Sequence, residues 1–196
     1  MFKRVSLKEF EAPTENIAVF GADIFVECYK RKSKYSSYSV KAVDAICKGR
    51  ISGIITGLEL GKVRRLVGLD VANELFYEKI GKKLECSFYE IMTVDYLDEY
   101  EKIPAYCKLF KLCKSTNLHK PDLSSVIASI ETDKMLVTND FHHWQQQNNI
   151  IRAYREKHAE KRAIEMIEKR KTNNQLKISD MRMFDSKDFC DLVLHI

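Results

Sequence analysis

The segment Ile51-Ser-Gly-Ile-Ile-Thr-Gly-Leu-Glu-Leu60 joins a short apolar run to the start of a helical pattern. The run at residues 51–56 is too short for a helix and predicts a buried strand. Apolar residues then recur at helical spacing from Leu58 to Val67. A buried strand followed at once by a helix is typical of α/β proteins with a parallel sheet.

The same unit recurs on both sides of this segment. Short apolar runs predict strands at residues 17–20 and 134–138, and a last strand is expected within residues 178–184. For residues 84–94 the pattern leaves helix and strand open. Helices are expected over residues 23–29, 39–47, 58–67, 70–80, 96–113, 122–130, 144–174 and 186–194. We therefore predict one domain over residues 1–196, a three-layer α/β/α sandwich with a central, mostly parallel sheet.

The composition is that of a globular chain of ordinary size. With 196 residues, 45% of them hydrophobic, the chain fits one domain with a hydrophobic core. Its longest apolar runs are about half as long as a membrane-spanning helix, and the first residues, MFKRVSLKEFEAP, contain no apolar leader segment. Six cysteines without a Cys-x-x-Cys pair favour reduced packing cysteines over zinc or disulfides. We expect a cytoplasmic protein that does not enter a membrane.

Acidic residues follow the predicted strands at the end where parallel sheets bind ligands. Asp23, Glu59 and Asp140 each come shortly after a strand, and Asp122 opens a helix. If the strands are neighbours, the four carboxylates converge, and oxygen ligands of this kind suit Mg²⁺ or Mn²⁺. A bound ion removes the repulsion between the acids and activates water for phosphodiester hydrolysis. The alternative is that each acid only caps its helix.

Three motifs carry a family resemblance. Thr56-Gly-Leu-Glu-Leu60, Pro121-Asp-Leu-Ser-Ser-Val-Ile-Ala128 and Leu136-Val-Thr-Asn-Asp140 resemble, in order and spacing, the second, third and fourth acidic motifs of PIN-domain ribonucleases. The resemblance covers residues 17–194 apart from the stretch after Trp144. It implies a PIN-like fold and a metal-dependent endoribonuclease of toxin or RNA-processing type that uses Mg²⁺ or Mn²⁺. The acids that it implies for catalysis and metal binding are Glu59, Asp122 and Asp140. Asp23 joins this predicted set from its position after the first strand, and Gly21, Thr138 and Asn139 are predicted to support the site.

The first motif of that family departs from the pattern. The family has a strand followed by Asp-x-Asn, whereas this chain has Gly21-Ala22-Asp23. In an extended strand Asp23 would face the same side as residue 21, displaced by about 6–7 Å. Three interpretations stay open: Asp23 replaces the missing ligand, the site binds metal weakly and is inactive, or an engineered Asp-to-Gly change has silenced a nuclease.

Two other functions stay open, and Gly21 favours the first of them. One is a catalytically impaired PIN-like module that binds RNA or a protein partner without cutting. The other is an unrelated α/β interaction domain in which the acids are only caps. Beyond RNA itself, the resemblance implies a protein inhibitor or antitoxin as a partner, and a homodimer.

Most of the net charge of +5 lies after Trp144, in a basic helical insertion over residues 144–175. Residues 150–175 contain eight Lys and Arg against four Glu, and residues 155–162 contain almost nothing to bury, which predicts a helix that projects from the body. Such a helix is either an arm that contacts RNA phosphates or a solvated helix with i,i+4 ion pairs. The residues of the RNA-binding interpretation are Arg152, Arg155, Lys157, Lys161, Arg162, Lys169 and Arg170.

Further polar residues flank the predicted acids. His142 and His143 follow Asp140, and we expect them in a loop near the cleft because no Cys or second His pair completes a zinc tetrahedron. Lys62, one turn beyond Glu59, is a secondary basic candidate together with Arg64 and Arg65.

Overall fold

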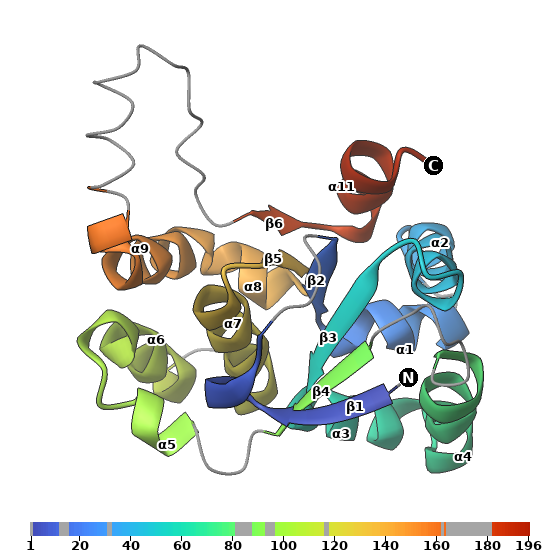
Figure 1. Cartoon of the computed structure of the whole chain (residues 1–196), viewed down its shortest axis with the longest axis horizontal. Coiled ribbons are helices and arrows are strands. Elements are labelled where there is room, and N and C mark those ends of the chain that lie inside the picture. Colours follow the sequence, from blue (N-terminus) through green and yellow to red (C-terminus); the bar gives the residue numbers. More distant parts are fainter. Residues whose placement is uncertain are drawn as a thin grey trace.

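The computed structural model describes residues 2–11, 16–30, 33–80, 88–92, 97–115, 118–161, 163 and 182–196. Within this part the chain forms a six-stranded parallel sheet with helices on both faces (Figure 1). Along the sheet the strands are β1 (Phe2–Ser6), β4 (Phe88–Met92), β3 (Ser52–Thr56), β2 (Ile17–Phe20), β5 (Met135–Val137) and β6 (Met183–Phe184). The predicted three-layer α/β/α sandwich with a parallel sheet is confirmed.

The central strands are buried on both faces. In β2, Ile17 and Val19 pack into the core on one side of the sheet, while Ala18 and Phe20 pack into the core on the other. Successive side chains of a strand point to opposite faces, so a strand covered by helices on both faces must be apolar throughout. This is why the predicted strands are short continuous apolar runs.

Two groups of helices cover the sheet. The Ile17 face is covered chiefly by α5 (Leu97–Tyr100), α6 (Pro104–Ser115), α7 (Lys120–Thr132) and α9 (Gln147–Lys157), with α8 (Phe141–Gln145) leading into α9. The Phe20 face is covered by α1 (Ala22–Lys30), α2 (Ser36–Cys47), α3 (Gly57–Val67), α4 (Leu69–Asn73), the π-helical η2 (Glu74–Ile80), α11 (Ser186–Phe189) and the π-helical η3 (Cys190–Leu194). A 3₁₀ turn, η1 (Leu7–Glu9), follows β1. None of the helices in the described part of the chain combines the length and apolar character of a membrane span.

Two strands differ from what the pattern predicts. The ambiguous residues 84–94 contain β4, which pairs with both β1 and β3. The edge strand β1 is missed altogether, because its sequence Phe-Lys-Arg-Val-Ser has two charged residues between its two apolar ones and so forms neither an apolar run nor an alternating pattern. Arg4 in β1 donates to Glu90 of β4 at 2.7 Å, so this edge of the sheet is joined partly by an ion pair. The part of the last predicted strand at residues 178–181 lies outside the described residues.

The basic helix does not project over its described length. Ile150, Ala153 and Tyr154 of α9 are buried, and α9 packs against α6 and α7. Beyond it, His158 Nε2 contacts the carbonyl oxygen of Ile130 at 2.8 Å, which holds the next turn against the end of α7. The expectation of a projecting helix is therefore wrong for residues 155–161, because it counted only their own few apolar side chains and not these distant contacts.

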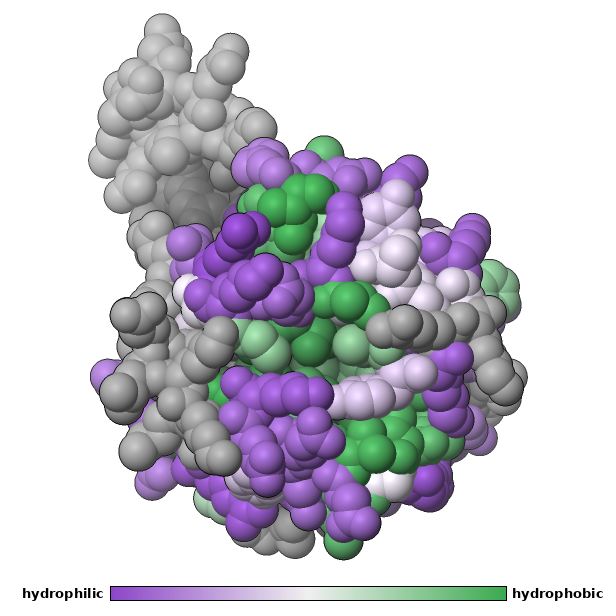
Figure 2. Space-filling model, turned by 90° about the vertical axis from the view of Figure 1, so that its right-hand side faces the viewer, coloured by the Kyte–Doolittle hydropathy of each residue, from purple (hydrophilic) through white to green (hydrophobic). Residues whose placement is uncertain are grey.

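An open cavity of about 480 Å³ lies between α1, α2 and η2, lined by residues that include Cys28, Val43, Cys47 and Leu75. The side of the molecule covered by α2 and α4 shows apolar groups between hydrophilic ones (Figure 2). The described lining residues include none of the four acids, so this cavity is separate from the predicted site.

Candidate metal centre

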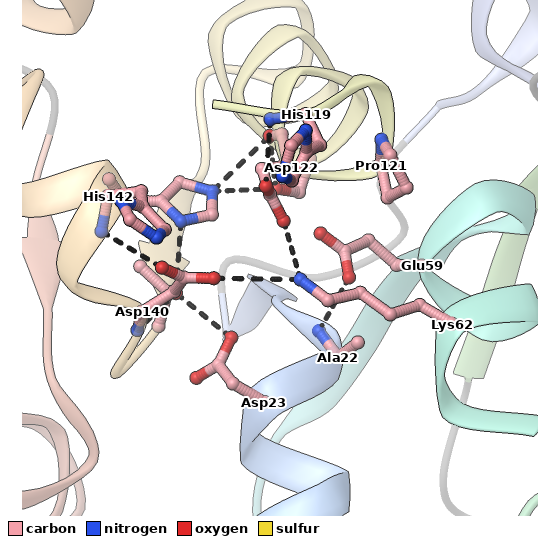
Figure 3. A network of polar contacts seen from close by, with 12 residues as sticks. Ala22, Asp23, Glu59, Lys62, His119, Pro121, Asp122, Asp140 and His142 are labelled. Atoms are coloured by element: carbon pink, nitrogen blue, oxygen red, sulfur yellow. Dashed lines mark hydrogen bonds and ion pairs between the residues drawn. The ribbon is translucent and has the colours of Figure 1, made fainter. Parts of the chain in front are cut away.

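Three neighbouring strands end at the same level of the sheet and place the acids. Val19 of β2 lies beside Ile54 of β3 and Leu136 of β5. Gly21, Thr56 and Thr138 lie two residues after these three positions. Asp23, Glu59 and Asp140 then follow them by two or three residues. Asp122 comes from the beginning of α7, where the Ser124 and Thr56 hydroxyls are 2.6 Å apart. The structure therefore brings together all four acids that the sequence analysis selected (Figure 3).

Glu59 is the most buried of the four, with no exposed surface. Thr56 caps α3 by accepting a hydrogen bond from the Glu59 backbone N–H at 3.3 Å, which orients the first turn of the helix. Glu59 Oε2 accepts a hydrogen bond from the Ala22 N–H at 2.9 Å, whereas Oε1 is buried without a partner among the described residues. Burial raises the pKa of Glu59 to about 8, assisted by the charges of Asp122 and Asp23.

Asp122 is held by the beginning of its own helix. Its side chain is 1% exposed, and Oδ2 accepts a hydrogen bond from the His119 N–H at 3.0 Å. Oδ1 accepts from Lys62 Nζ at 2.6 Å. A carboxylate at a helix N-terminus is favoured by the helix dipole.

Asp140 and Thr138 form the junction between β5 and α8. Asp140 caps α8, since its Oδ1 accepts from the His142 N–H at 2.9 Å. Burial tends to raise the pKa of Asp140, but this hydrogen bond and the charges of His143 and Lys62 lower it overall. Thr138 Oγ1 accepts from the Asp140 N–H at 3.1 Å and donates to Asp23 Oδ1 at 3.0 Å. The hydroxyl therefore links two of the acids.

Asp23 turns back over Gly21. Because α1 begins at Ala22, the strand does not continue, and the expected displacement of 6–7 Å along an extended strand does not apply. A Cβ on Gly21 would meet Asp23 Oδ1 closer than any real carbon contact, and Thr138 Oγ1 at 3.2 Å. Glycine is thus required at position 21 for this position of Asp23.

The carboxylate of Asp23 is tied to the start of the fourth motif. The Asn139 N–H donates to Asp23 Oδ2 at 2.5 Å. The pKa of Asp23 is raised to about 7, mainly by burial and further by the charge of Asp140. Asn139 also donates from its amide to Glu27 Oε2 at 2.7 Å and accepts from the Ser186 N–H at 2.8 Å, so it joins α1 and α11 to this edge of the sheet.

Lys62 occupies the middle of the group. Its Nζ lies 2.6 Å from Asp122 Oδ1 and 3.5 Å from Asp140 Oδ2, and Figure 3 shows the Glu59 carboxylate close by. Burial alone would lower the pKa of Lys62, but the surrounding carboxylates raise it well above its usual value, so the amine stays charged. From the sequence, Lys62 was predicted only as a secondary basic candidate together with Arg64 and Arg65. Its position three residues after Glu59 on one helix face was the available signal.

His143 was expected near the cleft, but in a loop. It is fully buried in α8 rather than in a loop, with Nε2 3.3 Å from the Asp122 carbonyl oxygen and Nδ1 3.5 Å from Thr138 Oγ1. Burial lowers its pKa, which favours the neutral imidazole. Glu59, Asp122 and His143 each offer one donor atom, and these atoms lie within 4.8 Å of one another. The Asp-x-His-His string was the signal for this histidine.

The donor set fits a divalent cation. Two or three carboxylates with one neutral imidazole match the ligands of several divalent metals and do not by themselves select Mg²⁺ or Mn²⁺. The buried, unpartnered Glu59 Oε1 is a free acceptor aimed at this group. A divalent ion would favour the charged forms of Glu59 and Asp23 and so remove the cost of burying them.

The basic residues of the RNA-binding interpretation lie elsewhere. Lys157 pairs with Glu131 at 2.8 Å, and Lys161 pairs with Asp133, both at the far end of α7 from Asp122. Glu131 comes nine positions after Asp122 in this helix, which corresponds to a rise of about 14 Å along the helix axis. Arg152 pairs with Glu156 of its own helix at 2.7 Å. Arg162, Lys169 and Arg170 lie outside the residues whose side chains are described.

No family model matches this chain, and no curated protein matches its sequence. The residues of the site therefore carry the functional argument.

Proposed function

We propose that the chain is a PIN-like endoribonuclease that hydrolyses RNA phosphodiester bonds with Mg²⁺ or Mn²⁺. The observation that supports this most is the convergence of Asp23, Glu59, Asp122 and Asp140 at the carboxyl edge of the sheet, with Glu59 Oε1 buried and unpartnered. RNA is the proposed substrate because the motifs around three of these acids resemble those of PIN-domain ribonucleases. An RNA substrate agrees with a cytoplasmic location, as do the thiols of Cys107, Cys113 and Cys190.

The residues have separate roles in this proposal. Glu59 and Asp122 hold the ion with Asp140, while His143 orients Asp122 through its backbone oxygen. A bound divalent ion supplies Lewis-acid activation of water and of the scissile phosphate. Asp23 is partly exposed beside these acids, and the bound ion would favour its charged form, so its carboxylate can take a proton from the attacking water.

A PIN-like module that binds without cutting is the second candidate. Gly21 replaces the leading acid of the family pattern, and Lys62 supplies a permanent positive charge among the remaining acids. In this case the partner is RNA or a protein such as an inhibitor or antitoxin, and a homodimer is expected from the resemblance alone.

RNA cleavage separates the two candidates. Wild type and Asp140→Asn are incubated with single-stranded and with structured RNA, in Mn²⁺ and in EDTA. We expect wild type to cut in Mn²⁺ only and Asp140→Asn to lose at least 100-fold in rate, because it loses a metal-site charge. Asp44→Asn, which removes an exposed acid of α2, is the matched control and should keep the wild-type rate.

The second candidate, a module that binds without cutting and is called the silent module below, makes a different prediction. The family pattern has Asp at position 21 and Asn at position 23, so it is restored with Gly21→Asp/Asp23→Asn, in which the side chain at position 23 must move away from residue 21. Cleavage by this double variant, with none by wild type, would support the silent module. Cleavage by neither would contradict the nuclease, and RNA binding by wild type would then decide for or against a binding module.

A further inference from the structure

Lys62 places its amine where a metal ion of this site would need to bind. Its Nζ is 2.6 Å from Asp122 Oδ1 and 3.5 Å from Asp140 Oδ2, so one ammonium group bridges two of the acids. Figure 3 shows it pointing from α3 into the middle of the four carboxylates. The side chain is 20% exposed, whereas that of Asp122 is 1% exposed, so the pair is largely withdrawn from water.

The ammonium group of Lys62 and a divalent ion would repel each other if both contacted the carboxylate oxygens of Asp122 and Asp140. A divalent ion binds carboxylate oxygen at about 2.0–2.2 Å. With Nζ still at its distance from the same oxygen, the two positive centres would be less than about 5 Å apart in a partly buried site, where water screens their repulsion poorly. Occupancy by the metal therefore requires Lys62 to leave the oxygens of Asp122.

The surroundings of α3 leave room for the Lys62 side chain to turn away from the carboxylates. Its neighbours Leu60 and Val63 anchor α3 in the core, whereas Gly61 and Arg65 are exposed. The space beside Gly61 is open, with nothing within 4 Å of an added Cβ. The lysine stem has four rotatable bonds and can turn outward while the helix stays in place.

We propose that Lys62 is a built-in competitor of the divalent ion, which occupies the Asp122–Asp140 side of the site and turns outward when the ion binds. The proposal rests on the metal centre of the proposed function and adds a regulation to it. At low metal concentration the ammonium group of Lys62 offsets the negative charge of Asp122 and Asp140. Because Lys62 also weakens metal binding, the fraction of sites that hold a metal depends on the concentration of free divalent ion.

Metal affinity of a charge-free variant is the first test. Lys62→Met keeps the length of the stem but removes the charge, and Mn²⁺ binding to the full chain is measured by the loss of the free-ion electron paramagnetic resonance signal. We expect the Kd for Mn²⁺ to fall at least 10-fold in Lys62→Met and to stay within 3-fold of wild type in Lys62→Arg. Lys48→Met, which removes an exposed lysine paired with Asp44, is the matched control and should leave the Kd unchanged. An unchanged or higher Kd in Lys62→Met overturns the proposal, as does the absence of Mn²⁺ binding in both forms.

A second measurement uses wild type only and so does not depend on the folding of a variant. Brief acetylation with acetic anhydride, followed by mass spectrometry, gives the reactivity of each lysine with and without Mn²⁺. We expect Lys62 to react at least 5-fold faster in Mn²⁺, because its amine is released, while Lys48 is unchanged. Equal or slower labelling of Lys62 in saturating Mn²⁺ overturns the proposal.

The RNA cleavage assay distinguishes a failure of the Lys62 competitor from a failure of the proposed nuclease function. Cleavage by wild type, without the changes in Mn²⁺ affinity and Lys62 labelling, would retain the nuclease and reject the competitor. Tighter Mn²⁺ binding by Lys62→Met and faster labelling, without cleavage by either form, would retain the competitor and reject the nuclease.

Discussion

Burial sets the protonation of two acids at the site. The pKa of Glu59 is about 8 and that of Asp23 about 7, against ordinary values of 4.5 and 3.8, in both cases mainly because burial penalises the charged form. The folded chain therefore binds protons in a pH range where the unfolded chain has released them. The free energy of unfolding consequently depends on pH through these residues.

The sign of this dependence is a direct prediction. Between about pH 4.5 and pH 8 the folded state holds the proton on Glu59 and the unfolded state does not, so without a divalent ion stability should fall as the pH rises. Glu59→Gln removes the buried acid and should raise the free energy of unfolding by about 4 kcal/mol at pH 8 and by little at pH 4.5. Urea unfolding in EDTA at both pH values measures this. Glu74→Gln, at an exposed ion pair, is the control, and a Glu59→Gln protein that is less stable than wild type at pH 8 would contradict the account.

Thr138 offers a second prediction at this scale. Its buried hydroxyl donates to Asp23 and accepts from the Asp140 N–H, so Thr138→Val leaves two polar groups short of a partner. We expect a loss of about 1–3 kcal/mol in the free energy of unfolding. The hydroxyl of Thr132 only bonds the Ala128 oxygen within α7, and Thr132→Val should cost less than about 1 kcal/mol. Equal losses for the two variants would show that the link between the acids contributes nothing.

Single residues also show where sequence reasoning ends. The acids could be selected because each follows a strand or opens a helix, which is local information. Lys62 and His143 could not be placed with the same certainty, since their positions depend on how α3 and α8 face α7 across the edge of the sheet. The RNA-binding assignments of Lys157 and Lys161 used charge alone, while their acidic partners on α7 are distant in sequence.

At the scale of elements, burial on both faces made the central strands predictable. β2 and β5 are continuous apolar runs, and β3 has Ile54 and Ile55 at its centre, because helices cover both sides of them. The edge strand β1 has a mixed pattern and could not be distinguished from a loop. The packing of α9 could not be predicted either, because its buried side chains Ile150 and Tyr154 meet a surface formed by α6 and α7.

The packing of α9 can be tested with two adjacent isoleucines. Ile150 is fully buried and Ile151 is only half-buried. Because a buried Ile→Ala change leaves a cavity, Ile150→Ala should lower the free energy of unfolding by about 3 kcal/mol and Ile151→Ala by about 1 kcal/mol or less. Chemical denaturation measures both values. Small and equal losses would contradict the packing of this part of α9 against α6 and α7.

The paired lysines near the end of α7 give an element-scale test of RNA binding. Lys157 and Lys161 are neutralised by Glu131 and Asp133, far from Asp122 along α7. We expect Lys157→Met/Lys161→Met to change the Kd for RNA less than 3-fold and the free energy of unfolding by less than about 1 kcal/mol, as for other partly exposed pairs. A fall in RNA affinity of 10-fold or more, with a reduced dependence on salt, would instead support the basic RNA arm.

At the scale of the whole molecule, the sheet and α7 together determine the site. The parallel strands bring Asp23, Glu59 and Asp140 to one edge, and the beginning of α7 adds Asp122 from the next layer. The fold class and this edge could be predicted from alternating strands and helices. The balance between four acids, one lysine and one buried histidine is a property of the folded chain, and it determines which cation the centre can hold.

The most direct test of the central claim is a crystal of the full chain grown in Mn²⁺, with anomalous diffraction recorded to locate the metal. The account predicts an anomalous peak about 2.0–2.3 Å from Glu59 Oε1 and from an oxygen of Asp122, with Lys62 turned away from Asp122. A structure at saturating Mn²⁺ with no peak among these acids, and with Lys62 Nζ still bound to Asp122, would contradict the metal centre.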